Sequence, residues 1–249
     1  MTAIVVALTE SDLRSRYGRG KSVTLKWLFD PFFALGVYFV LVAVMLDQGG
    51  EARALTIACS VVPFQLIITS FTSSLHAVRQ RRSILTNMRF DRGLLPVSTV
   101  LTETVAFGAA LGLLFATMGL SRVGPTTHLL WLALLVPLTM TVALAFAYPA
   151  TIFGLLYPDL RAFAVSGIRS PYFLAPSLVA LATVTGVAAE LPRLPPLPGV
   201  FEAYRSAVLY GEVPALWSIA IPLGYSALSF AVFVPLYRTE ARHFAKVVE

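Results

Sequence analysis

Six long apolar stretches constrain the fold of this 249-residue chain more than any other feature. A helix needs about 20 mostly apolar residues to cross the hydrocarbon of a bilayer. Six windows meet that length, at residues 27–46, 54–75, 94–120, 128–156, 171–189 and 215–237. Transmembrane helices satisfy their own backbone hydrogen bonds in lipid, and the alternating pattern of a barrel strand is absent. The sequence therefore predicts an all-α membrane protein with six transmembrane helices.

The charge content agrees with this prediction. Charged residues make up 13% of the chain, against about a quarter in an ordinary soluble domain. Too few charges remain to cover a water-facing surface, which argues against a soluble α/β enzyme. We expect one transmembrane domain over residues 1–249, with an interface helix at 1–26, the six spans within 27–237 and a tail at 238–249.

The positions of Lys and Arg predict the orientation. With the N-terminus inside, the inside segments hold five at 1–26, five at 76–93, two at 157–170 and three at 238–249. The outside segments hold the other four of the 19. This bias predicts that both termini face the cytoplasm. It also argues against nucleic-acid binding, because the basic residues are spread over four segments as topological signals.

Three segments outside the spans have recognisable patterns. In residues 1–26, apolar and charged side chains alternate at helical spacing, which predicts an amphipathic helix in the cytoplasmic interface; a loosely ordered basic tail is the alternative. The inside loop at 76–93 is longer than a tight turn needs. It contains Arg79, Arg81, Arg82, Arg89 and Arg92, and it is either a short surface helix or simply a topogenic arginine cluster.

The third segment is the outside stretch at 190–214. Prolines at 192, 195, 196 and 198 break the fifth helix. Apolar residues at 200, 203, 204 and 207 then predict a short amphipathic helix that lies on the outer leaflet or dips into it, with Gly211 as its stop.

Few residues suggest catalytic chemistry. The stretch 15–22 resembles the end of a P-loop, but it lacks the first glycine and the strand–loop–helix context that binds phosphates. The three histidines are far apart in sequence, and Cys59 is a single cysteine within an apolar run. The sequence therefore predicts no catalytic residue, no metal site and no cofactor bound by this chain itself.

Glu103 is the one acidic residue deep within a predicted span. An ionisable group in hydrocarbon is costly and is by default a candidate functional residue. It either lines an aqueous or glycan-bearing cavity or forms a hydrogen bond at a helix–helix contact, with Thr102 or Thr104 as neighbours. Gly108 and Gly112 follow at a spacing that favours close helix packing.

Aromatic side chains are frequent, with 17 Phe, 9 Tyr and 3 Trp. Several crowd the first predicted span, where Tyr38 and Phe39 are candidates for a path that stacks on sugar faces. Core or lipid-facing packing is the alternative for these residues.

Five short motifs, in order along the chain, resemble the membrane subunits of ABC-2 type exporters of lipid-linked polysaccharides such as O-antigen and teichoic acid. They are D-L-R-S-R-Y at 12–17 with Trp27 and Pro31, Pro63-Phe64 before a Ser-rich stretch, R-F-D-R-G-L-L-P at 89–96, Y-P-D-L at 157–160, and F-E-A-Y-R at 201–205 with Tyr210-Gly211. Asp91 and Pro158 stand where the family has Pro and Arg.

The resemblance implies a homodimer in the cytoplasmic (inner) membrane that pairs with two copies of a separate ATPase subunit, in which ATP and Mg²⁺ bind. The arginines of the 76–93 loop would be ATPase-coupling residues. Arg14, Arg16 and Tyr17 would belong to the interface helix. The outer gate would contain Phe201, Glu202, Tyr204 and Arg205. The resemblance implies a lipid-linked polysaccharide as substrate, and Tyr38, Phe39 and Glu103 are candidates for the pore lining.

Three other functions fit the same sequence in part. One is an ABC-2 permease for a lipid or drug. An intramembrane glycolipid-modifying enzyme would need several acids or histidines at one depth, and we find one acid. A secondary transporter would show two similar halves with broken helices at matching places, and we find no such self-similarity.

Overall fold

The computed structural model describes residues 6, 8–12, 53–81, 93–174 and 196–240. Within these ranges four helices are long and apolar enough to cross a membrane. They are α3 (Arg53–Gln80), α5 (Leu94–Leu120), α6 (Leu132–Leu156), which continues from the short 3-10 helix η1 (Thr127–Trp131), and α9 (Leu216–Glu240). Four of the six predicted spans are thus confirmed as helices. The predicted span at 27–46 and most of the one at 171–189 lie outside the described residues.

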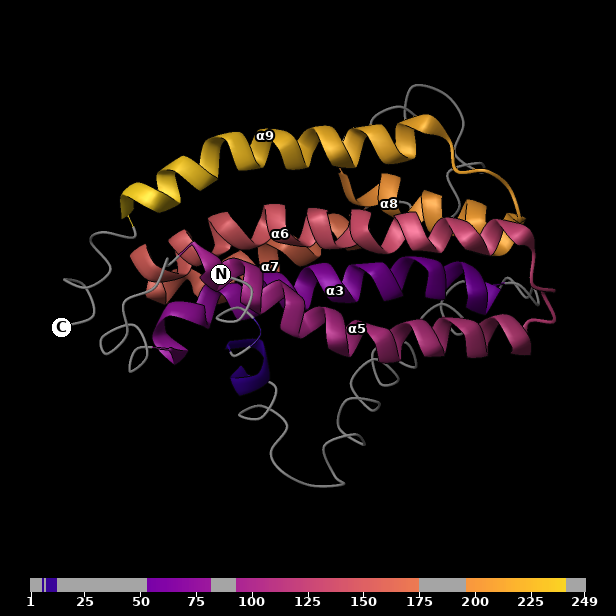
Figure 1. The fold of residues 1–249 in the computed structure, drawn as a ribbon, viewed down its shortest axis with the longest axis horizontal. Helices are drawn as coiled ribbons and strands as arrows, with labels where there is room; N and C mark the ends of the chain where they lie inside the picture. Colours follow the sequence, from indigo (N-terminus) through magenta and orange to yellow (C-terminus); the bar gives the residue numbers. More distant parts are fainter. Residues whose placement is uncertain (1–5, 7, 13–52, 82–92, 175–195, 241–249) are drawn as a thin grey trace.

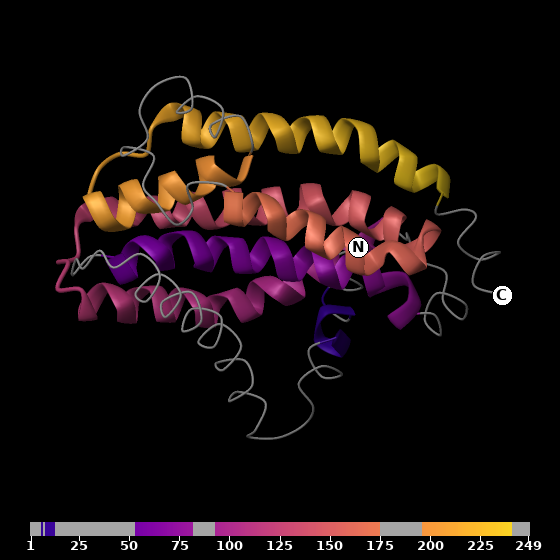
Figure 2. The same ribbon diagram turned by 180° about the vertical axis from the view of Figure 1, so that it is seen from behind.

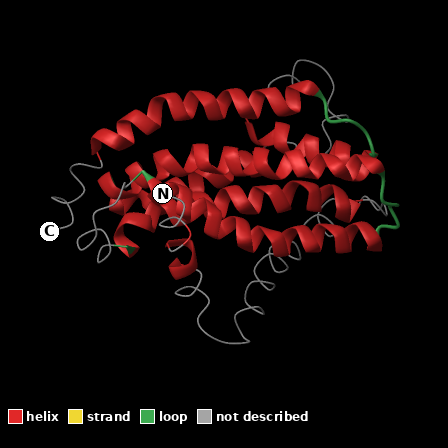
Figure 3. Cartoon of the chain, in the orientation of Figure 1, coloured by secondary structure: helices red, strands yellow, loops and turns green. Residues whose placement is uncertain are grey.

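The four long helices lie side by side and form one elongated bundle (Figure 1). Following the sequence colours, α3, α6 and α9 run in one direction and α5 runs in the opposite direction. This is the pattern expected of the second, third, fourth and sixth spans of a six-span chain. Loops in the described part lie at the ends of the helices (Figure 3). We call the end near Gln80, Leu94 and Leu156 the cytoplasmic end, following the predicted orientation.

The helices differ in how far they are enclosed. In the apolar window of α3, 72% of the residues are buried, against 17% in α9. α3 packs against α5, α6, α7 and α8 and is therefore the centre of the described bundle. The outer face of α9 exposes large apolar residues such as Leu216 and Leu228, as a lipid-facing helix does.

Polar side chains within the bundle are satisfied mainly by their own helix. The hydroxyls of Thr139, Thr141 and Ser226 bond to the carbonyl oxygens four residues earlier, at 2.8 Å in each case. Such bonds keep a hydroxyl paired in lipid without a partner on another helix. The bond from Ser229 to the carbonyl of Ala145, at 2.6 Å, instead connects α9 to α6.

Two helices extend beyond the limits that the composition predicts. After α6, the chain turns through η2 (Pro158–Leu160) into α7 (Arg161–Leu174), which lies across the back of the bundle (Figure 2). The helix that enters the predicted fifth span therefore starts at Arg161, ten residues before the limit at Pro171. Likewise α3 stays helical to Gln80, so residues 76–80 form its last turns rather than a loop.

The segment predicted to lie on the outer leaflet is an inner part of the bundle. α8 (Pro196–Arg205) continues as the π-helix η6 (Ser206–Tyr210) and packs against α3, α6 and α9. Pro196 and Pro198 are tolerated because the first turn of a helix needs no backbone N–H donor. The prediction that these prolines precede the helix was wrong. Gly211 ends the helix in the left-handed conformation, at φ 64°, as predicted.

Candidate functional site

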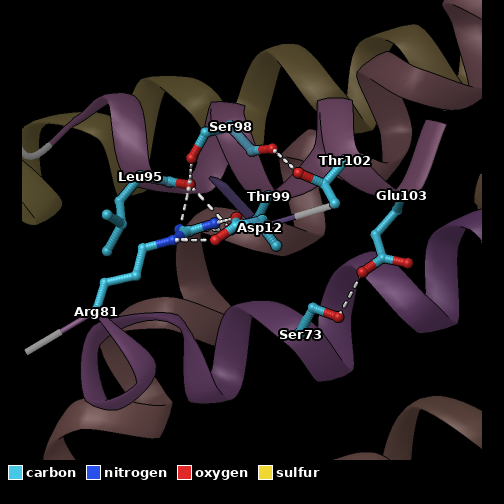
Figure 4. Close-up of polar contacts among 8 residues, drawn as sticks. All are labelled: Asp12, Ser73, Arg81, Leu95, Ser98, Thr99, Thr102 and Glu103. Carbon is cyan, nitrogen blue, oxygen red and sulfur yellow. Dashed lines mark hydrogen bonds and ion pairs between the residues drawn. The ribbon is translucent and has the colours of Figure 1, made fainter. Parts of the chain in front are cut away.

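At the cytoplasmic end, Arg81 directly follows α3 and points into the protein (Figure 4). It is 6% exposed. Its guanidinium forms an ion pair with Asp12, and the bond from Nε to Asp12 Oδ1 is 3.1 Å. It also donates to Thr99 Oγ1 at 3.1 Å and to the carbonyl oxygen of Leu95 at 3.4 Å. One side chain thus ties the N-terminal segment and the start of α5 to the end of α3.

Arg81 keeps its charge in this setting. Burial lowers the pKa of Arg81 to about 10, so the guanidinium is protonated at neutral pH. The carboxylate of Asp12 balances that charge, and two neutral oxygens accept its remaining hydrogen bonds. We call Arg81, Asp12, Thr99 and Leu95 the cytoplasmic tie.

The predicted coupling residues therefore differ among themselves. Arg79 is exposed at the end of α3, whereas Arg81 is buried within the protein. Arg82, Arg89 and Arg92 lie outside the described residues, as do Arg14, Arg16 and Tyr17. Of the interface helix, residues 6 and 8–12 are described and are helical, with Leu8 buried and Glu10 exposed.

Glu103 lies on α5 at its contact with α3. It is 4% exposed and accepts a hydrogen bond from the Ser73 hydroxyl at 2.7 Å (Figure 4). Thr102 and Thr104 bond to backbone carbonyls of α5 instead. The partner that the sequence did not suggest is thus Ser73 of the neighbouring helix. Tyr38 and Phe39, the other candidates for the pore lining, lie outside the described residues.

The four predicted gate residues lie together on α8, toward the outer end. Phe201, Tyr204 and Arg205 are at most 1% exposed. Arg205 pairs with Glu202 at 3.4 Å and donates to the hydroxyl of Ser60 on α3 at 2.9 Å. Phe201 meets Phe64 edge to face, with ring centroids 6.4 Å apart.

Tyr204 adds a bond to α6. Its hydroxyl lies 3.2 Å from Thr139 Oγ1, and Thr139 already donates to the carbonyl of Leu135. Tyr204 is therefore the donor in this bond. We call Glu202, Tyr204, Arg205, Ser60 and Thr139 the outer tie.

The sequence does contain a pattern that indicates the buried position of Arg81. The pattern was missed because the arginine-rich composition of residues 76–93 suggested a loop. Ser74, Ala77, Val78 and Arg81 recur at i, i+3, i+4 and i+7, and all are buried. This is the periodicity of one helix face, continued beyond the apolar window. Nothing in the sequence indicated that Asp12 would be the partner of Arg81.

The described residues thus form a multi-pass helical membrane protein with a buried arginine tie toward each end of its central helix. Among those residues, no three His, Cys, Asp or Glu side chains group as metal ligands.

Comparison with known proteins finds relatives that are named as export permeases. The chain is 24% identical over 235 residues to the O-antigen export system permease protein RfbA of Myxococcus xanthus, which covers 91% of this chain and 90% of that protein. Two proteins of the same name from Klebsiella pneumoniae are also similar. One is 25% identical over 182 residues, which cover 71% of this chain and 69% of that protein. The other is 24% identical over 218 residues, which cover 84% of this chain and 82% of that protein. No family model matches. These relatives confirm the resemblance to ABC-2 type O-antigen export permeases that the motifs indicated.

Proposed function

We propose that this chain is the membrane-spanning subunit of an ATP-driven exporter that moves a lipid-linked polysaccharide across the cytoplasmic membrane. The observation that carries the proposal is the similarity over 91% of the chain to a protein named as an O-antigen export system permease. The bundle supports it, because its four long apolar helices are those of a multi-pass membrane protein.

The proposed assembly contains two copies of this chain and two copies of a separate ATPase subunit that binds ATP and Mg²⁺. A permease that belongs to an export system needs an energy source, and a partner ATPase supplies it. The N- and C-termini and the 82–92 segment face the cytoplasm in this proposal, which agrees with the basic residues of the inside segments.

In this proposal the cytoplasmic tie transmits force from the ATPase to the membrane helices. Arg79 is exposed and, with Arg82, Arg89 and Arg92, forms the contact with the ATPase. Arg81 does not touch the partner in this arrangement. It joins the N-terminal helix to α3 and α5, so that a push on the segment between α3 and α5 moves these elements together.

In this proposal α8, which the outer tie holds in place, is the gate. α8 spans only part of the bundle, where it packs against α3, α6 and α9, and its polar contacts run to α3 and α6. In the exporting state, α8 moves away from Ser60 and Thr139 and a path opens for the glycan. Glu103, Tyr38 and Phe39 stay candidates for the lining of that path.

The test is depletion of this protein in its host, followed by an assay of lipid-linked glycan on each side of the cytoplasmic membrane. We expect polymer to accumulate inside while surface glycan falls. An unchanged distribution would contradict the polysaccharide assignment and favour a lipid or drug as cargo. Co-purification tests the class separately, because an ABC subunit retains an ATPase at a 1:1 ratio and an intramembrane enzyme does not.

A further inference from the structure

An apolar groove of about 520 Å³ lies between α3, α6 and α7. Its walls include Phe71 of α3, Phe146 and Phe153 of α6, Tyr157, and Ala164 and Ile168 of α7. The start of α8 and Phe233, in the second half of α9, complete it. The volume is within the roughly 300–1,000 Å³ of sites that enclose most of a small ligand. Its walls are hydrocarbon almost throughout, so the occupant that they suit is an alkyl chain.

A cationic side chain, Arg161, lies at the cytoplasmic edge of this groove. Arg161 precedes Ala164 and Ile168 on the same face of α7, at i, i+3 and i+7. Its Nε donates to the carbonyl of Gly154 at 2.9 Å, and its Nη2 bonds to the same oxygen. Gly154 directly follows Phe153, a wall residue. The guanidinium therefore lies where the groove meets the end of the bundle.

His76 lies beside this arginine. Gly154 packs so closely on α3 that an added Cβ would overlap the carbonyl of Leu75, and His76 is the next residue. Arg161 and Arg79 lie close enough for their charges to act on the His76 imidazole, which can offer a phosphate a hydrogen-bond donor and no charge of its own. Asp159 is the acidic residue nearest in sequence to Arg161, and within the described ranges it forms no ion pair.

We propose that this groove binds one phosphate-bearing lipid of the cytoplasmic leaflet, with an alkyl chain between α6 and α7 and the phosphate against Arg161 and His76. Charge complementarity selects the headgroup, because clusters of basic residues at the cytoplasmic interface attract anionic lipids. The apolar walls favour a lipid over a free phosphate, because only a lipid has an alkyl chain to fill the groove. The site is separate from both ties, and it does not depend on which cargo the protein exports.

Native mass spectrometry of the full-length chain, exchanged into nanodiscs of phosphatidylglycerol or of phosphatidylcholine, tests the proposal. We expect one retained phosphatidylglycerol per chain and at least tenfold less phosphatidylcholine. H76Q combined with R161Q should lower phosphatidylglycerol retention at least tenfold, and H76Q with R161K should restore most of it. Equal retention of the two lipids would overturn the headgroup assignment.

A groove-filling variant tests the site of the alkyl chain and leaves Arg161 and His76 unchanged. Gly167 lines the groove, and an added Cβ there meets no atom within 4 Å. Gly167→Leu should therefore fold and should displace the lipid. Gly108→Leu, at an equally open position on α5 outside the groove, is the matched control and should retain it. Retention by Gly167→Leu, or full displacement by millimolar inorganic phosphate, would contradict the lipid site.

Discussion

The two ties each bury an arginine with a carboxylate, but they differ in which segments the charges join. In the cytoplasmic tie, the ion pair spans 69 residues of sequence, from Asp12 to Arg81. In the outer tie, Glu202 and Arg205 are three residues apart on one helix. The ionic pair therefore holds separate segments together at one end and belongs to a single helix at the other.

This difference sets how easily each region can move. Pulling the N-terminal segment away from α3 would leave a charged guanidinium buried without its carboxylate, which costs about 3–5 kcal/mol. Moving α8 away from α3 keeps the Glu202–Arg205 pair. It breaks the bond to Ser60 and the contact of Phe201 with Phe64. The cytoplasmic tie is suited to transmit force between the N-terminal segment, α3 and α5. The outer tie is suited to let α8 separate from α3.

The largest expected effect is that of Arg81→Glu. This change removes the cation and places a second carboxylate beside Asp12, and it should destabilise the protein by about 5 kcal/mol. Thermal unfolding in detergent measures this. Arg79→Glu is the matched control, since Arg79 is exposed two residues earlier and should change stability by at most about 0.5 kcal/mol. Equal losses of stability in the two variants would mean that the buried contacts of Arg81 do not stabilise the protein.

Gly154→Ala should cost about 3 kcal/mol, because the added methyl group overlaps the backbone of Leu75 and overpacking of a core is destabilising. The change tests whether the cytoplasmic end is held by packing as well as by charge. Gly108→Ala, at an open helix position, should instead be neutral or stabilising by up to about 1 kcal/mol. The same unfolding experiment compares the two variants, and a neutral Gly154→Ala would show that α3 and α6 can separate freely there.

Ser60→Ala tests the outer tie. Hydrogen bonds to charged groups contribute about 1.5–3 kcal/mol, so we expect a loss of about 2 kcal/mol that is confined to α8. Hydrogen–deuterium exchange of residues 196–210 should accelerate about 30-fold. Ser226→Ala is the control, because that hydroxyl bonds to its own helix at Pro222 and should leave α8 unchanged. Faster exchange in the N-terminal segment rather than in α8 would contradict the division into two ties.

The sequence predicts the spans better than it predicts these ties. Hydrophobic length gives 94–120 without error and 128–156 and 215–237 to within two residues, because lipid thickness fixes how long an apolar helix must be. The same criterion misses the starts of α7 and α8, since Arg161 and the prolines at 196 and 198 are not apolar signals and yet begin helices. Three residues of the F-E-A-Y-R motif, Glu202, Tyr204 and Arg205, take part in one tie, and their role as a gate stays a prediction. The Asp12–Arg81 pair follows only from the tertiary fold.

The smallest effect is expected at Tyr204, and it should differ from that at Thr139 although one bond joins the two residues. Thr139 keeps its bond to Leu135 after Tyr204→Phe, so this change should cost about 1 kcal/mol. Thr139→Val leaves the Tyr204 hydroxyl, in a side chain that is 0% exposed, without this acceptor. A buried donor left unsatisfied costs about 1–3 kcal/mol, so we expect about 2 kcal/mol. Exchange of α8 measures both, and the two changes combined should cost no more than Thr139→Val alone. If Tyr204→Phe instead exceeds Ser60→Ala, α8 is held by α6 rather than by α3, and the release step must begin at Thr139.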